Sequence, residues 1–119
     1  MRIIVAGSRN YDNTEDFFRR MDSIPDSAPW FLDITEVVSG TARGTDTMGE
    51  FWADHFYIPV KRFPANWEKF GRSAGPRRNG EMAQYADGLV AFWDGLSPGT
   101  RSMIDLAKGR GLKVHIEMI

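Results

Sequence analysis

Three turns of small and polar residues follow three short apolar runs of the chain, and two of these turns carry an arginine. The turns comprise residues 7–10, 39–46 and 94–100, and the apolar runs before them comprise residues 2–6, 34–38 and 89–93. Backbone N–H groups in such turns, and the first N–H groups of a following helix, attract anions. We therefore expect the chain to hold a phosphate-bearing small molecule. The residues that we predict to contact it are Gly7, Ser8, Arg9, Ser39, Gly40, Thr41, Ala42, Arg43, Gly44, Asp46, Asp94, Gly95, Ser97, Gly99 and Thr100.

The turn at residues 39–46 offers the most specific ligand chemistry. Gly40 and Gly44 let the backbone approach a ligand closely, because neither carries a side chain. Arg43 presents a planar fork to a phosphate, and Asp46 is placed to accept a hydrogen bond from a ribose hydroxyl. A structural interpretation stays open, in which Gly44 only makes a turn and Asp46 only caps a helix. The same alternative stays open at Ser97, which could bind an anion or could only cap the helix that follows it.

Residues 61–79 form a basic stretch, with six lysines or arginines against the single acidic residue Glu68. Phe63, Trp67 and Phe70 are interleaved with these charges, a combination that suits a nucleotide's phosphate and base or a single nucleic-acid strand. The competing interpretation is that the charges are solvated and the aromatic side chains belong to the core. Arg78 stands out, because it shares a helical stripe with Met82 that should point toward the sheet.

Several common classes of protein are excluded by what the chain lacks. A dinucleotide-binding fold has G-x-G-x-x-G after its first strand, and here only Gly7 follows the first apolar run. The segment from Gly40 to Gly44 has neither the spacing nor the lysine of a P-loop. No G-x-S-x-G elbow of a serine hydrolase is present. With two histidines and no cysteine, no metal site is predicted. The net charge of -1 gives no general attraction to nucleic acid or membranes. No segment is apolar for long enough to span a bilayer, so we expect a cytoplasmic protein.

The alternation of apolar runs and helix-like segments predicts five strands and four helices. The strands are expected at residues 3–5, 35–38, 59–63, 89–93 and 112–116. The helices are expected from a cap at Asp12 or Asn13 to Pro25, over residues 48–56, from Pro76 through Tyr85, and from Ser97 to Gly109 or Gly111. Residues 26–33 and 64–74 are expected to form loops, the second of them ordered or lid-like.

An unbroken alternation of strands and helices is typical of a doubly wound α/β fold with a parallel sheet. Right-handed crossovers favour the strand order 3-2-1-4-5, with helices on both faces and a switch point between the first and fourth strands. We predict a single domain over residues 1–119. Because the carboxyl ends of parallel strands meet at one edge, the three turns should converge there.

Residues 1–10, 39–46, 61–67, 74–79 and 91–100 together resemble the YspA/YpsA-related branch of the SLOG superfamily. The superfamily includes the DNA-processing protein DprA and the LOG phosphoribohydrolases, and its members share a Rossmann-like sheet that binds nucleotides or their derivatives. The resemblance covers nearly the whole chain. It implies a Rossmann-like fold and a nucleotide ligand.

The phosphoribohydrolases carry H-E-R-K-x-x-M-A, then A-D, then P-G-G-x-G-T-x-x-E. Residues 76–83, 86–87 and 94–103 fall in the same places. The resemblance places Arg78 on the catalytic arginine and Gly99-Thr100 on the phosphate-binding turn. We also expect Asn79, the neighbour of Arg78, to contact the ligand. Met103 stands at the glutamate position, and a thioether cannot act as a general acid or base. Asp46, Glu50 and Asp94 remain as substitute carboxylates.

We therefore expect a nucleotide-binding protein that needs no other cofactor and acts as a sensor or accessory protein of phage or bacterial origin. One alternative is a nucleoside-monophosphate phosphoribohydrolase that uses Arg78. Another is a nucleic-acid-binding module like DprA, which would use residues 61–78. We expect no membrane partner, and exposed aromatic residues on the outer helices suggest a homodimer.

Overall fold

Each of the five predicted strands forms in the computed structural model, which describes residues 1–119, and all five join one parallel sheet. The strands are β1 (Arg2–Gly7), β2 (Glu36–Ser39), β3 (Val60–Arg62), β4 (Gly88–Trp93) and β5 (Lys113–Met118). Their order across the sheet is β3-β2-β1-β4-β5. The predicted α/β fold, its strand order and its switch point between β1 and β4 are confirmed.

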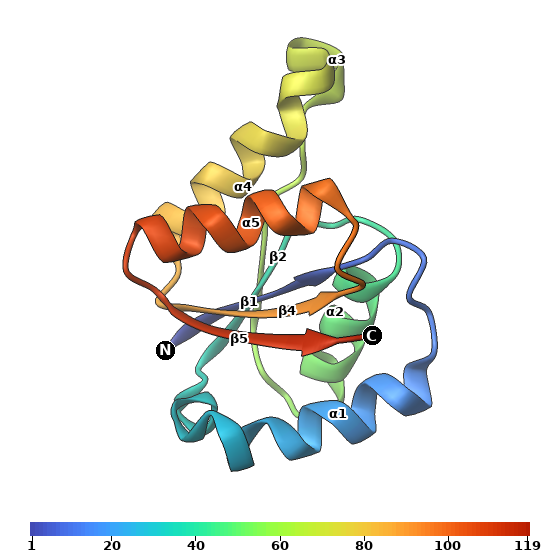
Figure 1. Ribbon diagram of the computed structural model, residues 1–119, viewed down its shortest axis with the longest axis vertical. Helices are drawn as coiled ribbons and strands as arrows, with labels where there is room; N and C mark the ends of the chain where they lie inside the picture. Colours follow the sequence, from blue (N-terminus) through green and yellow to red (C-terminus); the bar gives the residue numbers. More distant parts are fainter.

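Helices cover both faces of this sheet (Figure 1). They are α1 (Thr14–Ser27), α2 (Thr45–His55), the short α3 (Trp67–Phe70), α4 (Ala74–Tyr85) and α5 (Pro98–Gly109). Successive side chains of a strand point to opposite faces. Ile3 and Val5 of β1 accordingly pack with α1 and α2, whereas Ile4 and Ala6 pack with α4 and α5. The two apolar layers hold the carboxyl ends of the strands in register.

The central strands are buried on both faces, as expected of a parallel sheet. Ile3, Ile4 and Val5 of β1 have no exposed surface, and the same holds for the four residues from Leu89 to Phe92 of β4. Burying one such side chain fully contributes about 1.5–3 kcal/mol. The turns that follow β1 and β4 therefore start from the most firmly packed part of the molecule.

The predicted end of the first helix at Pro25 is wrong. Asn13 caps α1 by accepting from the Asp16 N–H at 3.0 Å, but the helix continues through Pro25 to Ser27. Proline removes only one helical hydrogen bond here, and the Ile24 carbonyl still accepts from the Ala28 N–H at 2.8 Å. Burial of Met21 and Ile24 outweighs that loss. Residues Pro29–Asp33 then form a 3₁₀ helix where we expected a loop.

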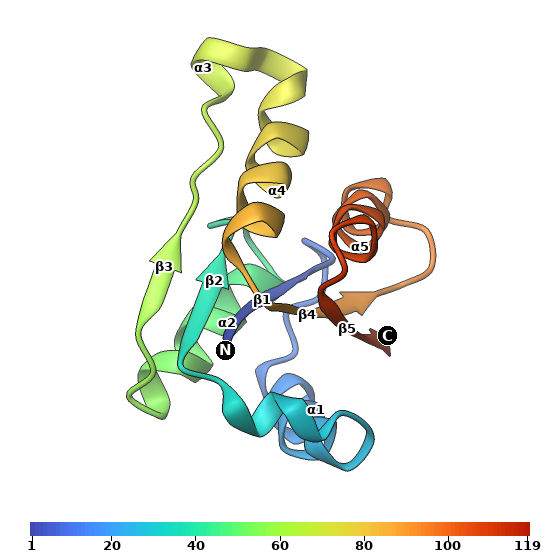
Figure 2. The same cartoon turned by 90° about the vertical axis from the view of Figure 1, so that its left-hand side faces the viewer.

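The predicted loop at residues 64–74 is also more structured than its sequence pattern indicates. It contains α3, the 3₁₀ turn Gly71–Ser73 and the start of α4. Asn66 caps α3 by accepting from the Lys69 N–H at 3.0 Å. A helix of four residues is too short to show a hydrophobic period. The segment projects from the body of the protein beyond the edge of the sheet (Figures 1 and 2).

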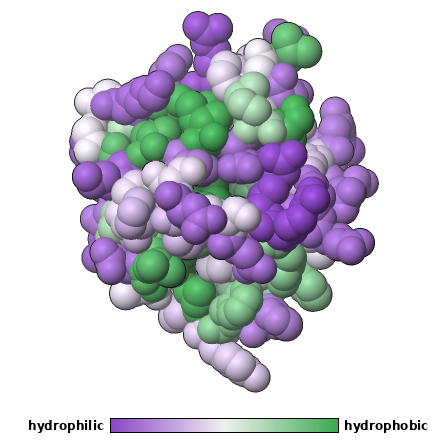
Figure 3. All heavy atoms as spheres, turned by 60° about the horizontal axis from the view of Figure 1, so that its bottom comes forward, coloured by the Kyte–Doolittle hydropathy of each residue, from purple (hydrophilic) through white to green (hydrophobic).

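The outer surface is mixed in character. Seen with the α1 side brought forward, apolar side chains form several patches separated by hydrophilic ones (Figure 3). The large apolar side chains that stay exposed are Leu32, Phe51, Phe56, Tyr57, Trp67, Leu96 and Met118. No helix combines the length and the apolar character needed to cross a membrane. The expected homodimer stays a prediction.

Candidate functional site

A cavity of about 530 Å³ opens where the predicted turns meet, at the carboxyl ends of β1 and β4. It is walled by the turns after β1, β2 and β4, by α4 and by the first turn of α5. Eleven of the predicted site residues line it: Gly7, Ser8, Arg9, Ala42, Arg43, Asp46, Arg78, Asn79, Ser97, Gly99 and Thr100. Gly40 and Thr41 line an adjoining hollow that shares Arg9, Arg43 and Arg78 with the first.

The remaining predicted site residues lie outside both hollows and hold the turns in shape. Asp94 accepts hydrogen bonds from the N–H groups of Leu96 (2.8 Å) and Ser97 (2.7 Å), and Gly95 turns the chain with a φ of 82°. The Ser97 and Leu96 N–H groups hold the pKa of Asp94 below its usual value. Ser39 is fully buried and donates its hydroxyl to Glu50 at 2.6 Å. Gly44 joins two turns by close packing.

Gly44 allows the turns after β1 and β2 to touch. Its φ is 75°, and a Cβ at this position would lie 2.5 Å from the Arg9 carbonyl oxygen. The hydroxyl of Thr45 donates to the Ser8 carbonyl at 3.0 Å across the same contact. Thr41, in the same turn, is a β-branched residue with a φ of 63°, a conformation that is strained for threonine. Strain of this kind clusters at functional sites.

The start of α5 presents free backbone donors to the cavity. The first hydrogen bond within the helix runs from the Arg101 N–H to the Ser97 carbonyl at 3.1 Å, which leaves Gly99 and Thr100 N–H without a helical acceptor. Ser97 occupies the cap position, but its hydroxyl donates to Asp94 at 3.1 Å and makes no capping bond. Because Pro98 has no N–H, the Gly99 and Thr100 groups are the leading donors of this turn.

Arg78 reaches the cavity from α4 and is only 9% exposed. Its Nη1 donates to the Gly40 carbonyl, and its Nε donates to Asn79 Oδ1 at 2.9 Å. No carboxylate forms an ion pair with it. Burial lowers the pKa of Arg78, and the attraction of the more distant Asp46 opposes this shift. Buried charges are normally paired. Arg78 is therefore a buried cation that still lacks an adjacent anion.

Asp46 lies across Gly40 from Arg78. Asp46 Oδ2 and Arg78 Nη1 both lie within 3 Å of the point where a Cβ on Gly40 would stand, and a side chain there would fill the gap between them. The carboxylate accepts from the Ala42 N–H at 3.2 Å. Burial raises the pKa of Asp46 to about 6, although that hydrogen bond and the charges of Arg78 and Arg9 oppose the shift.

The charges that line the main cavity favour an anion. Arg9, Arg43 and Arg78 face it with Asp46 as the single carboxylate. With the free N–H groups of α5 added, the cavity is suited to a phosphate or carboxylate group. No cluster of three or more histidine, cysteine, aspartate or glutamate side chains is arranged to hold a metal ion.

Only one of the three substitute carboxylates, Asp46, lies at the cavity. Glu50 accepts from Ser39 and from Arg62 Nε at 2.9 Å, away from the cavity lining. Asp94 is held in its own turn. Met103 is 1% exposed and packs in the apolar layer with Ile4 and Met82. The position that the resemblance matches to the phosphoribohydrolase glutamate therefore belongs to the core.

Several cavity residues are absent from the predicted set. Asn10, Trp67, Gly75, Pro76 and Ser102 also line it. Ser102 was predictable, because it lies four residues after Pro98 and so on the same helical face. Trp67 was considered for a nucleotide's base as part of the basic stretch, but its position at the cavity and that of Gly75 were not predictable, since both depend on the path of the short α3.

The fold and cavity define a Rossmann-like α/β protein with an arginine-lined cavity at its switch point. Residues 1–70 match the model of a family described as "YspA, cpYpsA-related SLOG family". The chain belongs to this family, which confirms the resemblance. It is also similar to "Gene 61 protein" of Mycobacterium phage D29, with 32% identity over 119 residues that cover 95% of this chain and 93% of that protein. No solved structure matches the chain.

Proposed function

We propose that the protein binds a nucleotide or nucleotide derivative, with a phosphate between Arg78 and the first turn of α5. The single observation that carries this proposal is that Arg78 is buried at the cavity without an anionic partner. A phosphate would supply the missing negative charge and accept from the Gly99 and Thr100 N–H groups. Membership of the SLOG family supports a nucleotide-related ligand.

We also propose that the protein acts by binding, as a sensor or accessory protein of phage or bacterial origin. The similarity to a phage protein supports that origin. The burial of Met103 supports a role without catalysis, because this position offers no carboxylate to a ligand.

Thermal-shift titrations with adenosine 5′-monophosphate (AMP), NAD and ADP-ribose test the binding proposal. A ligand at one hundred times its dissociation constant stabilises a protein by about 2.7 kcal/mol. Arg78→Ala should weaken binding by roughly 1.5–3 kcal/mol, the range for a hydrogen bond to a charged group, and leave the melting temperature without ligand nearly unchanged.

Arg77→Ala is the matched control. Arg77 is the neighbouring arginine of α4, but it is exposed and lies over the Phe70 ring, 4.3 Å from its centroid, outside the cavity lining. This variant should bind as the wild type does. Equal binding by Arg78→Ala and the wild type would refute the proposed site.

A second candidate function is cleavage of a nucleotide's N-glycosidic bond, and the position of Asp46 favours it. A buried carboxylate with a pKa of about 6, across Gly40 from an arginine, is the kind of group that serves in acid–base catalysis. Chromatography after prolonged incubation with AMP separates the two functions. We expect no adenine or ribose 5-phosphate from the wild type; release that disappears in Asp46→Asn and Arg78→Ala would establish the enzyme instead.

A further inference from the structure

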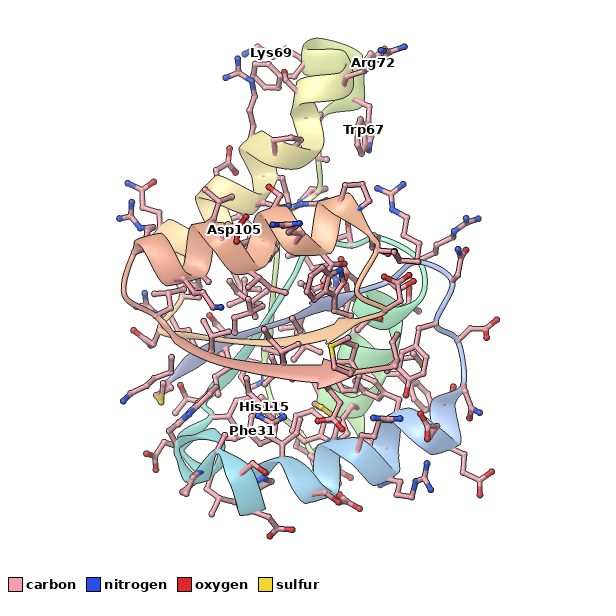
Figure 4. All side chains as sticks on the ribbon, viewed as in Figure 1. Phe31, Trp67, Lys69, Arg72, Asp105 and His115 are labelled. Carbon is pink, nitrogen blue, oxygen red and sulfur yellow. The ribbon has the colours of Figure 1, made fainter.

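Trp67 is the only aromatic side chain that lines the cavity. It belongs to α3, the segment that projects from the body, and 50% of its surface is exposed. Figure 4 shows Trp67 pointing back from α3 toward the body, while Lys69 and Arg72 lie at the far end of the projection. A large flat ring therefore overhangs a hollow that Arg9, Arg43 and Arg78 also line.

The backbone of α4 provides the support for this ring. A Cβ on Gly75 would lie 3.3 Å from Trp67 Cη2, so the indole edge rests where Gly75 has no side chain. The Arg9 guanidinium lies 5.9 Å from the centre of the Trp67 ring. These contacts hold the indole at the cavity and leave half of its surface to solvent.

The other two aromatic residues of the basic stretch are already engaged elsewhere. Phe63 packs on Tyr85 with ring centres 5.4 Å apart. Phe70 is approached by Lys69 at 5.1 Å and by Arg77 at 4.3 Å, and it does not line the cavity. No aromatic ring of the protein stacks on Trp67. Its exposed half is thus the only aromatic surface at the cavity that is open to a base, and the Arg9 guanidinium lies over the same ring.

We infer that Trp67 stacks on the base of the ligand and thereby selects nucleotides over sugar phosphates. This inference rests on the proposed function, since it takes the phosphate of the same ligand to lie at Arg78. Every nucleobase has a π-face, and stacking on an aromatic side chain tolerates different bases. A sugar phosphate offers the same anion but no flat ring. Trp67 is accordingly a specificity residue, and the preferred ligand carries a heteroaromatic base.

The test compares AMP with ribose 5-phosphate, two probes that share the sugar phosphate and differ in the base. Affinities for both are measured by calorimetry on the wild type, Trp67→Ala, Trp67→Phe and Phe70→Ala. Phe70→Ala is the matched control, because it removes an aromatic side chain from the same short helix without touching the cavity lining.

The wild type should prefer AMP by roughly 5- to 150-fold, the range that base–aromatic stacking supplies. Trp67→Ala should bring the ratio close to one with the affinity for ribose 5-phosphate unchanged, whereas Trp67→Phe and Phe70→Ala should retain most of the preference. An equal ratio in the wild type and Trp67→Ala, or equal losses for both probes, would overturn the stacking role. In that case, binding of ribose 5-phosphate that depends on Arg78 would still support the proposed phosphate site. Failure of both probes to bind the wild type would refute the proposed function and the stacking role of Trp67 together.

Discussion

Arg78 and Asp46 approach one glycine from two different helices without forming an ion pair. Arg78 comes from α4 and Asp46 from the first turn of α2, and Gly40 lies between them. Burial removes solvation free energy from each charge, and the attraction between the two charges offsets only part of that loss. Because this compensation is incomplete, we expect the pair to respond to an incoming anion and to pH.

Asp46→Asn should stabilise the protein at pH 7.5 but not at pH 4. The pKa of Asp46 in the folded protein is about 6 against its usual 3.8. Its favourable contribution to stability is therefore complete below pH 3.8 and is lost as the pH rises through 6. The shift corresponds to about 3 kcal/mol. Asparagine keeps an acceptor for the Ala42 N–H and removes the titration.

Urea denaturation at both pH values measures this effect. Asp105→Asn, which alters an exposed carboxylate of α5, controls for the loss of one negative charge. If the difference between Asp46→Asn and the wild type were the same at both pH values, the carboxylate would not be desolvated as described.

At the scale of elements, the site depends on how closely the turns after β1 and β2 pack. Gly44→Ala should cost about 2–4 kcal/mol of stability, because its φ of 75° is unfavourable for alanine and the new Cβ would meet the Ser8 and Arg9 carbonyl oxygens. These oxygens belong to the backbone and cannot move aside cheaply. Ligand affinity should fall as well, since both turns line the cavity.

Gly80→Ala, within α4, should stabilise the protein, in contrast to Gly44→Ala. Nothing lies within 4 Å of a Cβ at this position, and alanine is the better helix former by roughly 0.5–1 kcal/mol. Chemical denaturation of both variants should therefore give shifts of opposite sign. A stable Gly44→Ala protein would show that the two turns are not locked together at this residue.

The strands and their order were predictable because each rests on a short-range pattern and one general rule. Apolar runs that end in glycine or small polar residues mark β1, β2 and β4, and right-handed crossovers fix their order. The convergence of three turns at one edge follows from that topology. The four-residue α3 was not predictable, and with it the approach of Trp67 to Gly75 was also missed.

The detailed chemistry of the site needed long-range contacts that no local pattern contains. The hydrogen bond from Arg78 to Gly40 joins residues 38 positions apart. The burial of Asp46, which raises its pKa, likewise depends on side chains from several elements. Conversely, the capping pattern at Ser97 was visible in sequence, but the nearby Asp94 takes the hydroxyl.

At the scale of the whole molecule, the cavity floor and the core share side chains. Met82 lines the cavity and also belongs to the apolar layer that contains Met103. Met103→Glu should therefore unfold or severely destabilise the protein, because a carboxylate would be buried without a partner. Met103→Leu should cost less than about 1.5 kcal/mol.

Thermal denaturation followed by circular dichroism distinguishes these two variants. A Met103→Glu protein with wild-type stability would contradict the placement of residue 103 in the core. It would also reopen the comparison with the phosphoribohydrolases, since the glutamate would then be able to reach the cavity.

A crystal structure of the wild-type protein with AMP tests the central claim most directly. The account predicts the phosphate in the cavity, within hydrogen-bonding distance of the Arg78 guanidinium and of the Gly99 or Thr100 N–H group. The phosphate would then join α4 to α5 at the switch point between β1 and β4. AMP bound with its phosphate away from both Arg78 and the start of α5 would contradict it.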